Sequence, residues 1–142
     1  MSPTRKNLAK DLEQIVHEGL KDIKLPYSKG NSIRLGNAVV RDSKNGYLIY
    51  NTQTNSQVAR TNFKTSAVAI AKNIDRLQTN ASLERILNLD LKLSKHYQDA
   101  VFYRHTMATT KDFTKRDATR SRYDLTVAYI RKYKTDLDAF IF

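Results

Sequence analysis

The chain has 142 residues, of which 25 are Lys or Arg and 14 are Asp or Glu, so its formal net charge is +11 and its pI is near 9.9. This length fits one domain, or a small domain with an appendage. The absence of cysteine excludes disulfides and thiolate metal sites. The positive excess favours polyanionic partners, above all nucleic acid, and carries no information about the fold.

The first predicted element is an amphipathic helix over residues 2–23. Ser2 can cap it and Pro3 fits its first position, where a missing N–H costs nothing. The apolar residues draw one stripe at helical spacing: Leu8, Leu12, Ile15, Val16, Leu20 and Ile23. We expect no secretory signal at this end, and no apolar run in the chain is long enough to span a membrane.

The period then changes, and residues 32–63 predict a three-stranded antiparallel meander. The strands are expected over residues 32–41, 47–51 and 57–63. Asn45-Gly46 is a strong hairpin signal because both residues tolerate positive φ, and Thr54-Asn55 predicts the second turn. The middle strand is apolar on both faces, so we expect it to be central and at least partly covered on both sides.

Helices are predicted for the rest of the chain. Thr65 or Ser66 should cap a short Ala-rich helix over residues 67–77 that can lie close to the sheet. Long helices over residues 82–106 and 114–140, the second capped by Thr114, should form an antiparallel hairpin with residues 108–113 as connector. Their apolar stripes are Ile86, Leu89, Leu93, His96, Ala100, Tyr103 and Met107, then Tyr123, Thr126, Ile130, Tyr133, Leu137 and Phe140. A second stripe on the first helix is Leu83, Leu87 and Leu91.

These elements predict an α+β fold in two parts. Residues 1–80 form a basic module with a helix, a three-stranded meander and an Ala-rich helix. Residues 81–142 form the long helical hairpin. The hairpin leaves apolar surface on its outer side, which favours a homo-oligomer. The candidate interface residues are Tyr129, Phe140, Ile141 and Phe142.

The positive charge is concentrated in the meander, because residues 24–64 hold seven basic residues against Asp42 alone. A β structure of this kind can lie in a DNA major groove, with Tyr47 or Tyr50 stacking or hydrogen-bonding beside the cations. The candidate nucleic-acid-binding residues are Arg34, Arg41, Lys44, Arg60 and Lys64. The alternative is that these charges only protect sheet edges from aggregation. If both faces of the middle strand are covered, no free face remains for a groove.

A second basic cluster lies in the last predicted helix. Its members are Lys115, Arg116, Arg120 and Arg122. This cluster could bind a phosphate backbone or an acidic partner. Asp117 and Asp124 lie within the same turns, so a salt-bridged solvent face is the alternative interpretation.

The sequence contains no pattern typical of catalysis. The glycines are scattered rather than gathered into a phosphate-binding loop, and paired carboxylates in an apolar setting are absent. No histidine has a third potential metal ligand nearby. We therefore expect a non-enzymatic protein without a cofactor or a metal ion.

Residues 33–50, 57–61 and 67–72 resemble small proteins of unassigned function in contractile-tailed marine cyanophages. The order of three strands and a helix is also similar to the DNA-binding arm of phage integrases, although the catalytic residues of those recombinases have no counterpart here. The resemblance implies a virus-encoded protein located in the bacterial host cytoplasm or in the virion. It assigns no site residues.

We therefore expect a basic phage protein that binds nucleic acid through a cationic surface. Two alternatives remain open. The chain could be a virion structural or assembly protein, a component of the capsid, neck or tail, that docks on acidic protein surfaces. It could also be a small regulator that binds a host enzyme.

Overall fold

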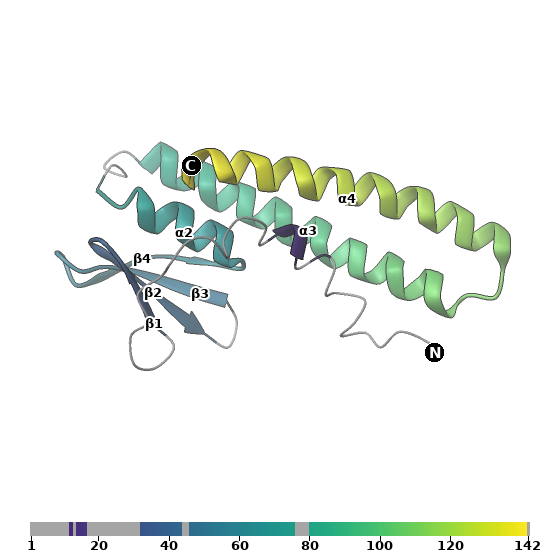
Figure 1. Cartoon of the computed structure of the whole chain (residues 1–142), viewed down its shortest axis with the longest axis horizontal. Helices are drawn as coiled ribbons and strands as arrows, with labels where there is room; N and C mark the ends of the chain where they lie inside the picture. The colour runs from purple at the N-terminus through teal and green to yellow at the C-terminus, as the bar shows by residue number, and fades with distance from the viewer. Residues whose placement is uncertain (1–11, 13, 17–31, 44–45, 76–79, 142) are drawn as a thin grey trace.

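The computed structural model describes residues 12, 14–16, 32–43, 46–75 and 80–141. In these ranges a four-stranded antiparallel sheet precedes one short helix and two long ones (Figure 1). The strands are β1 (Ser32–Leu35), β2 (Ala38–Ser43), β3 (Gly46–Asn51) and β4 (Ser56–Thr61), in that spatial order. The helices are α2 (Lys64–Lys72), α3 (Asn80–Thr109) and α4 (Phe113–Ile141). The α+β class is confirmed, but the sheet has four strands where three were predicted.

The additional strand arises because the segment predicted as one strand over residues 32–41 turns back at Gly36. Leu35 pairs with Ala38, so Gly36 and Asn37 form a two-residue hairpin turn. Gly36 has a φ of 56°, a left-handed value that glycine adopts at no steric cost. The turn therefore reverses the chain in the middle of an otherwise strand-like run.

The second predicted turn is present, whereas half of the first lies outside the described residues. Ser43 pairs with Gly46, so the residues between them join β2 to β3; these two residues, Lys44 and Asn45, lie outside the described part. Gly46 has a φ of 133°, and a Cβ there would collide with the carbonyl oxygen of Thr61 on β4. Asn55 takes the left-handed conformation in the second turn, with a φ of 52°.

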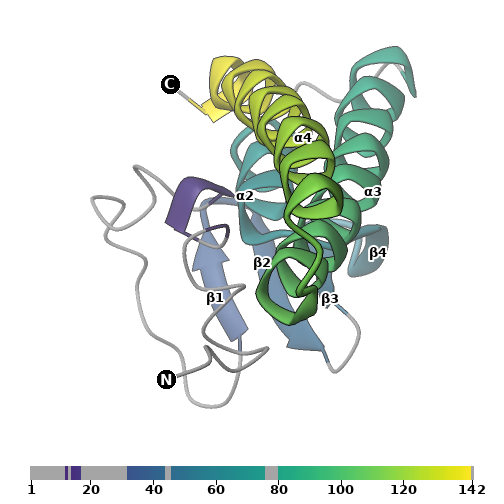
Figure 2. The ribbon, with the colours of Figure 1, turned by 90° about the vertical axis from the view of Figure 1, so that its right-hand side faces the viewer.

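The short helix α2 is buried between the sheet and the helical hairpin (Figures 1 and 2). Every residue from Thr65 to Ala71 is buried. Alanine side chains allow this close approach on several sides, whereas the Ala-rich sequence predicted only the approach to the sheet. The core around α2 contains Ala38, Val40, Ile49 and Ala59 from the sheet and Ile86, Leu93, Ile130 and Leu137 from the hairpin.

The predicted caps of α2 are wrong. The helix begins at Lys64, and the residue before it, Phe63, makes no side-chain cap. The buried carboxylate of Asp90 on α3 instead accepts hydrogen bonds from the backbone N–H of Asn62 at 2.9 Å and of Phe63 at 3.2 Å, and from the Asn62 side-chain amide at 2.9 Å. Thr65 Oγ1 donates to the backbone oxygen of Val16 at 2.5 Å. Asp90 on α3 is therefore hydrogen-bonded to the residues that follow the last strand of the sheet.

The antiparallel hairpin is confirmed, with both helices longer than predicted and a connector of three residues, 110–112. The cap of α4 is Asp112 rather than Thr114, because Asp112 Oδ1 accepts from the backbone N–H of Thr114 at 3.0 Å and of Lys115 at 3.3 Å. The main predicted stripes face the seam and are buried or half-buried. Leu91 of the second stripe is exposed.

The predicted N-terminal helix falls mostly outside the described residues. Of residues 2–23, the structure describes 12 and 14–16, which are helical. Leu12 and Val16 are fully buried in the core.

In the described ranges, none of the helices has an apolar stretch sufficient to cross a lipid bilayer.

Candidate nucleic-acid interface

The strand register divides the sheet residues between two faces. Ala38, Val40 and Ile49 point to α2, and because side chains alternate along a strand, their neighbours Val39 and Arg41 point to the other face. Helices α2, α3 and α4 lie on the first side of the sheet (Figures 1 and 2). The sheet therefore presents a second face that is opposite the core.

Three of the predicted arginines share that second face. Arg41 pairs with Leu48, and Leu48 pairs with Arg60, so these three side chains form a row across β2, β3 and β4. The next row starts at Arg34 on β1, continues through Val39 on β2 and reaches Tyr50 on β3. We call these six residues the arginine face: Arg34, Val39, Arg41, Leu48, Tyr50 and Arg60.

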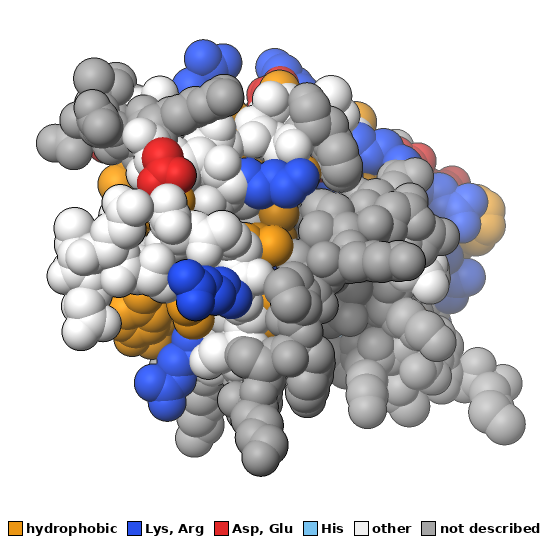
Figure 3. Space-filling view, turned by 60° about the vertical axis from the view of Figure 1, so that its left-hand side comes forward, with side chains coloured by type: hydrophobic (Ala, Val, Ile, Leu, Met, Phe, Trp, Pro, Cys, Tyr) orange, Lys and Arg blue, Asp and Glu red, His pale blue; other side chains and the backbone are white. Residues whose placement is uncertain are grey.

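The arginine face has an apolar centre and a cationic border. Its three arginines are exposed, whereas Val39, Leu48 and Tyr50 are half-buried. Strands lie about 4.8 Å apart, so Arg41 and Arg60, two strands apart, are separated by about 10 Å at the backbone. Figure 3 shows exposed hydrophobic side chains next to Lys and Arg side chains at this end of the molecule.

Among the described residues, carboxylates do not pair with Arg34 or Arg41 of this face. Arg34 Nε donates to the carbonyl oxygen of Gly36 at 3.2 Å. Asp42 pairs with Tyr47 and so belongs to the opposite face of the sheet. Asp75 accepts from the side-chain amide of Asn37 at 3.2 Å. The positive charge of Arg34 and Arg41 is therefore available to an anionic partner.

The register also distinguishes the two candidate tyrosines. Tyr47 lies on the inner face, where it packs against the core. Tyr50 pairs with Val39 and lies on the arginine face. The odd spacing of these residues within one strand places them on opposite faces, but only the position of the core identifies which face is outside.

The second basic cluster lies far from the sheet. Lys115, Arg116, Arg120 and Arg122 are exposed near the start of α4, at the connector end of the hairpin, whereas the sheet is at the other end (Figure 1). Arg116 Nη2 donates to the carbonyl oxygen of Thr110 at 2.7 Å, which satisfies a group at the end of α3.

The two remaining predicted binding residues do not join the arginine face. Lys64 is half-buried at the first position of α2. Lys44 lies outside the described residues.

The predicted interface residues differ in accessibility. Tyr129 is 41% exposed, and its ring contacts His96 with 5.2 Å between centroids. Phe140 is half-buried beside Arg85, whose Cζ lies 6.0 Å from the ring centroid. Ile141 is only 7% exposed and belongs to the chain's own core, and Phe142 lies outside the described part.

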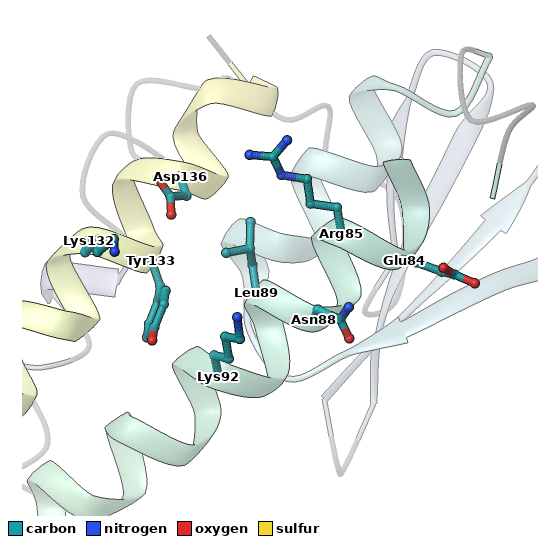
Figure 4. A pocket seen from close by; sticks show the side chains of 8 residues that line it. All are labelled: Glu84, Arg85, Asn88, Leu89, Lys92, Lys132, Tyr133 and Asp136. Carbon is teal, nitrogen blue, oxygen red and sulfur yellow. The ribbon is translucent and has the colours of Figure 1, made fainter. Parts of the chain in front are cut away.

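A groove of about 500 Å³ lies between α3 and α4 (Figure 4). Its lining contains Glu84, Arg85, Asn88, Leu89, Lys92, Lys132, Tyr133 and Asp136. The side chains of Arg85 and Lys92 reach toward the space between the helices, and Lys92 Nζ lies 6.0 Å from the Tyr133 ring centroid. The three cations are accompanied by two carboxylates, so this groove attracts an anion less than the arginine face does.

Comparison with known proteins gives no further constraint. No protein-family model matches the chain, and neither a curated protein nor a solved structure matches it.

Proposed function

We propose that this chain is a non-enzymatic nucleic-acid-binding protein and that the arginine face is its contact surface. The observation that carries the proposal is the strand register, which gathers Arg34, Arg41 and Arg60 on the face of the sheet that points away from the core. Arginine binds phosphate oxygens through several N–H groups of a planar, permanently charged guanidinium.

The net charge of +11 supports the same proposal, because it attracts a polyanion from a distance before contacts form. The basic cluster at residues 115–122 lies at the other end of the hairpin and would act as a separate, weaker contact. A bacterial virus is the setting that we propose, with the host cytoplasm or the virion as the location.

The salt dependence of binding tests this proposal. Each phosphate contact contributes about 0.7 to the log–log salt slope on a single strand and about 0.9 on a duplex. Three arginine contacts therefore predict that affinity for a labelled oligonucleotide falls about 20- to 40-fold between about 50 and 200 mM salt. Fluorescence anisotropy measures this change.

A flat response between the two salt concentrations would contradict the proposal. In that case the exposed cations would be explained by docking on an acidic protein surface, and affinity purification from a phage-infected host would identify the virion component or host enzyme concerned.

A further inference from the structure

The arginine face differs from a purely electrostatic surface because its centre is apolar. Leu48 lies between Arg41 and Arg60 in one row, and Tyr50 lies beside Val39 in the next. A phosphate backbone alone gains nothing from Val39, Leu48 or the ring of Tyr50, and can use only the Tyr50 hydroxyl. A partner that buries them must present apolar or aromatic surface together with negative charge.

We infer that the arginine face binds single-stranded nucleic acid, with a base stacked on Tyr50 and the phosphates on the surrounding arginines. The inference rests on the proposed function and specifies the kind of nucleic acid that is bound. In a duplex the faces of the bases are stacked on one another and cannot reach a sheet surface. In a single strand they are free to stack on an aromatic ring, which is a sequence-tolerant interaction.

The dimensions of the face fit a short stretch of single strand. The four strands span about 14 Å from β1 to β4, and the arginines stand on three different strands, β1, β2 and β4. Tyr50 lies on β3, with Arg34 two strands away on one side in its own row. A chain of a few nucleotides that crosses the strands would place one base on Tyr50 and adjacent phosphates on both sides.

Electrostatics alone predicts the opposite preference. Duplex DNA has the higher charge density and the steeper salt slope, so a surface that recognises only charge binds a duplex more tightly than a single strand. A preference for the single strand would therefore report contacts with the bases.

The test compares three labelled probes at about 100 mM salt. They are oligo-dT and oligo-U of about 12 nucleotides and a DNA duplex of about 12 base pairs. We expect the single strands to bind more tightly than the duplex. Tyr50→Val, which keeps a strand-forming side chain but removes the ring, should weaken single-strand binding about tenfold. The matched control Tyr50→Phe keeps the ring and should stay within about twofold of the unmodified chain.

The outcomes separate the inference from the proposed function. Oligo-dT and oligo-U distinguish DNA from RNA as the source of the strand, and tight binding of either supports the inference. Equal or tighter duplex binding, with Tyr50→Val unchanged, would overturn the inference and leave the proposed function intact. Salt-independent or undetectable binding of all three probes would overturn both.

Photocrosslinking of the unmodified chain to iodouracil-substituted oligo-dU keeps the inference testable if Tyr50→Val fails to fold. Trypsin should release residues 45–60 as one peptide, since no Lys or Arg occurs between Gly46 and Ala59. We expect the crosslink on this peptide at Tyr50. A crosslink confined to peptides of α3 or α4 would contradict the inference.

Discussion

Replacing Asp90 with alanine is expected to lower the free energy of unfolding by about 3 kcal/mol. Asp90 is 2% exposed, and its carboxylate accepts hydrogen bonds from the backbone N–H groups of Asn62 and Phe63. Its loss would leave these donors without a partner beside the start of α2. The negative charge also interacts favourably with the positive end of that helix. Urea denaturation followed by circular dichroism measures the change.

Two further variants make this result specific. Asp90→Asn keeps one acceptor oxygen and removes the charge, so we expect about half of the loss. Asp117→Ala removes the same charge from an exposed position on α4 and should change the free energy of unfolding by less than about 0.5 kcal/mol. Equal effects of Asp90→Ala and Asp117→Ala would show that the buried hydrogen bonds contribute little.

Changing Arg34, Arg41 and Arg60 together to glutamine should weaken oligonucleotide binding about 100-fold at about 100 mM salt. The log–log salt slope should fall by about 2 on a single strand, because three phosphate contacts are lost at about 0.7 each. The three side chains are exposed and lie outside the core, so the fold should survive the change. Anisotropy titrations across a salt series measure both quantities.

The matched control removes the same charge from the hairpin. Lys95, Lys111 and Arg131 are exposed, and changing all three to glutamine lowers the net charge equally. We expect this control to keep most of the affinity and nearly the full salt slope. If the two triple variants lose affinity equally, binding depends on net charge alone and the arginine face is not a site.

The helical hairpin was predictable because its signal is local and repeated. Apolar residues recur at helical spacing for about thirty positions in each helix, so one displaced residue does not change the prediction. The cap was less secure, because Asp112 and Thr114 are both good capping residues within one turn. Only the hydrogen bonds of the structure show that the Asp112 side chain accepts from the free N–H groups in the first turn of α4.

The composition of the arginine face was only partly predictable. Arg34 and Arg41 are an odd number of positions apart, so one uninterrupted strand over residues 32–41 would point them to opposite faces. The turn at Gly36 reverses the chain, and Arg34 then pairs with Val39 on the same face as Arg41. A prediction that omits this turn therefore omits the fourth strand as well. It also cannot explain why these arginines lie on one face.

The role of Asp90 could not be predicted from the sequence, for a different reason. Its partners Asn62 and Phe63 lie 28 and 27 positions earlier in the chain, and no local pattern connects them. In the sequence, Asp90 is simply one polar residue within a long helix. Its burial depends on how α3 crosses the end of the sheet, which is a property of the tertiary packing.

The most direct test of the arginine face is a two-dimensional NMR titration of the isotope-labelled chain with oligo-dT. We expect the largest amide shifts to cluster on the sheet, at Arg34, Arg41, Leu48 and Arg60 and their neighbours on β1 to β4. The amide signals of residues 115–122 should shift much less. Large shifts confined to the hairpin, with the sheet unchanged, would contradict the assignment of the binding surface.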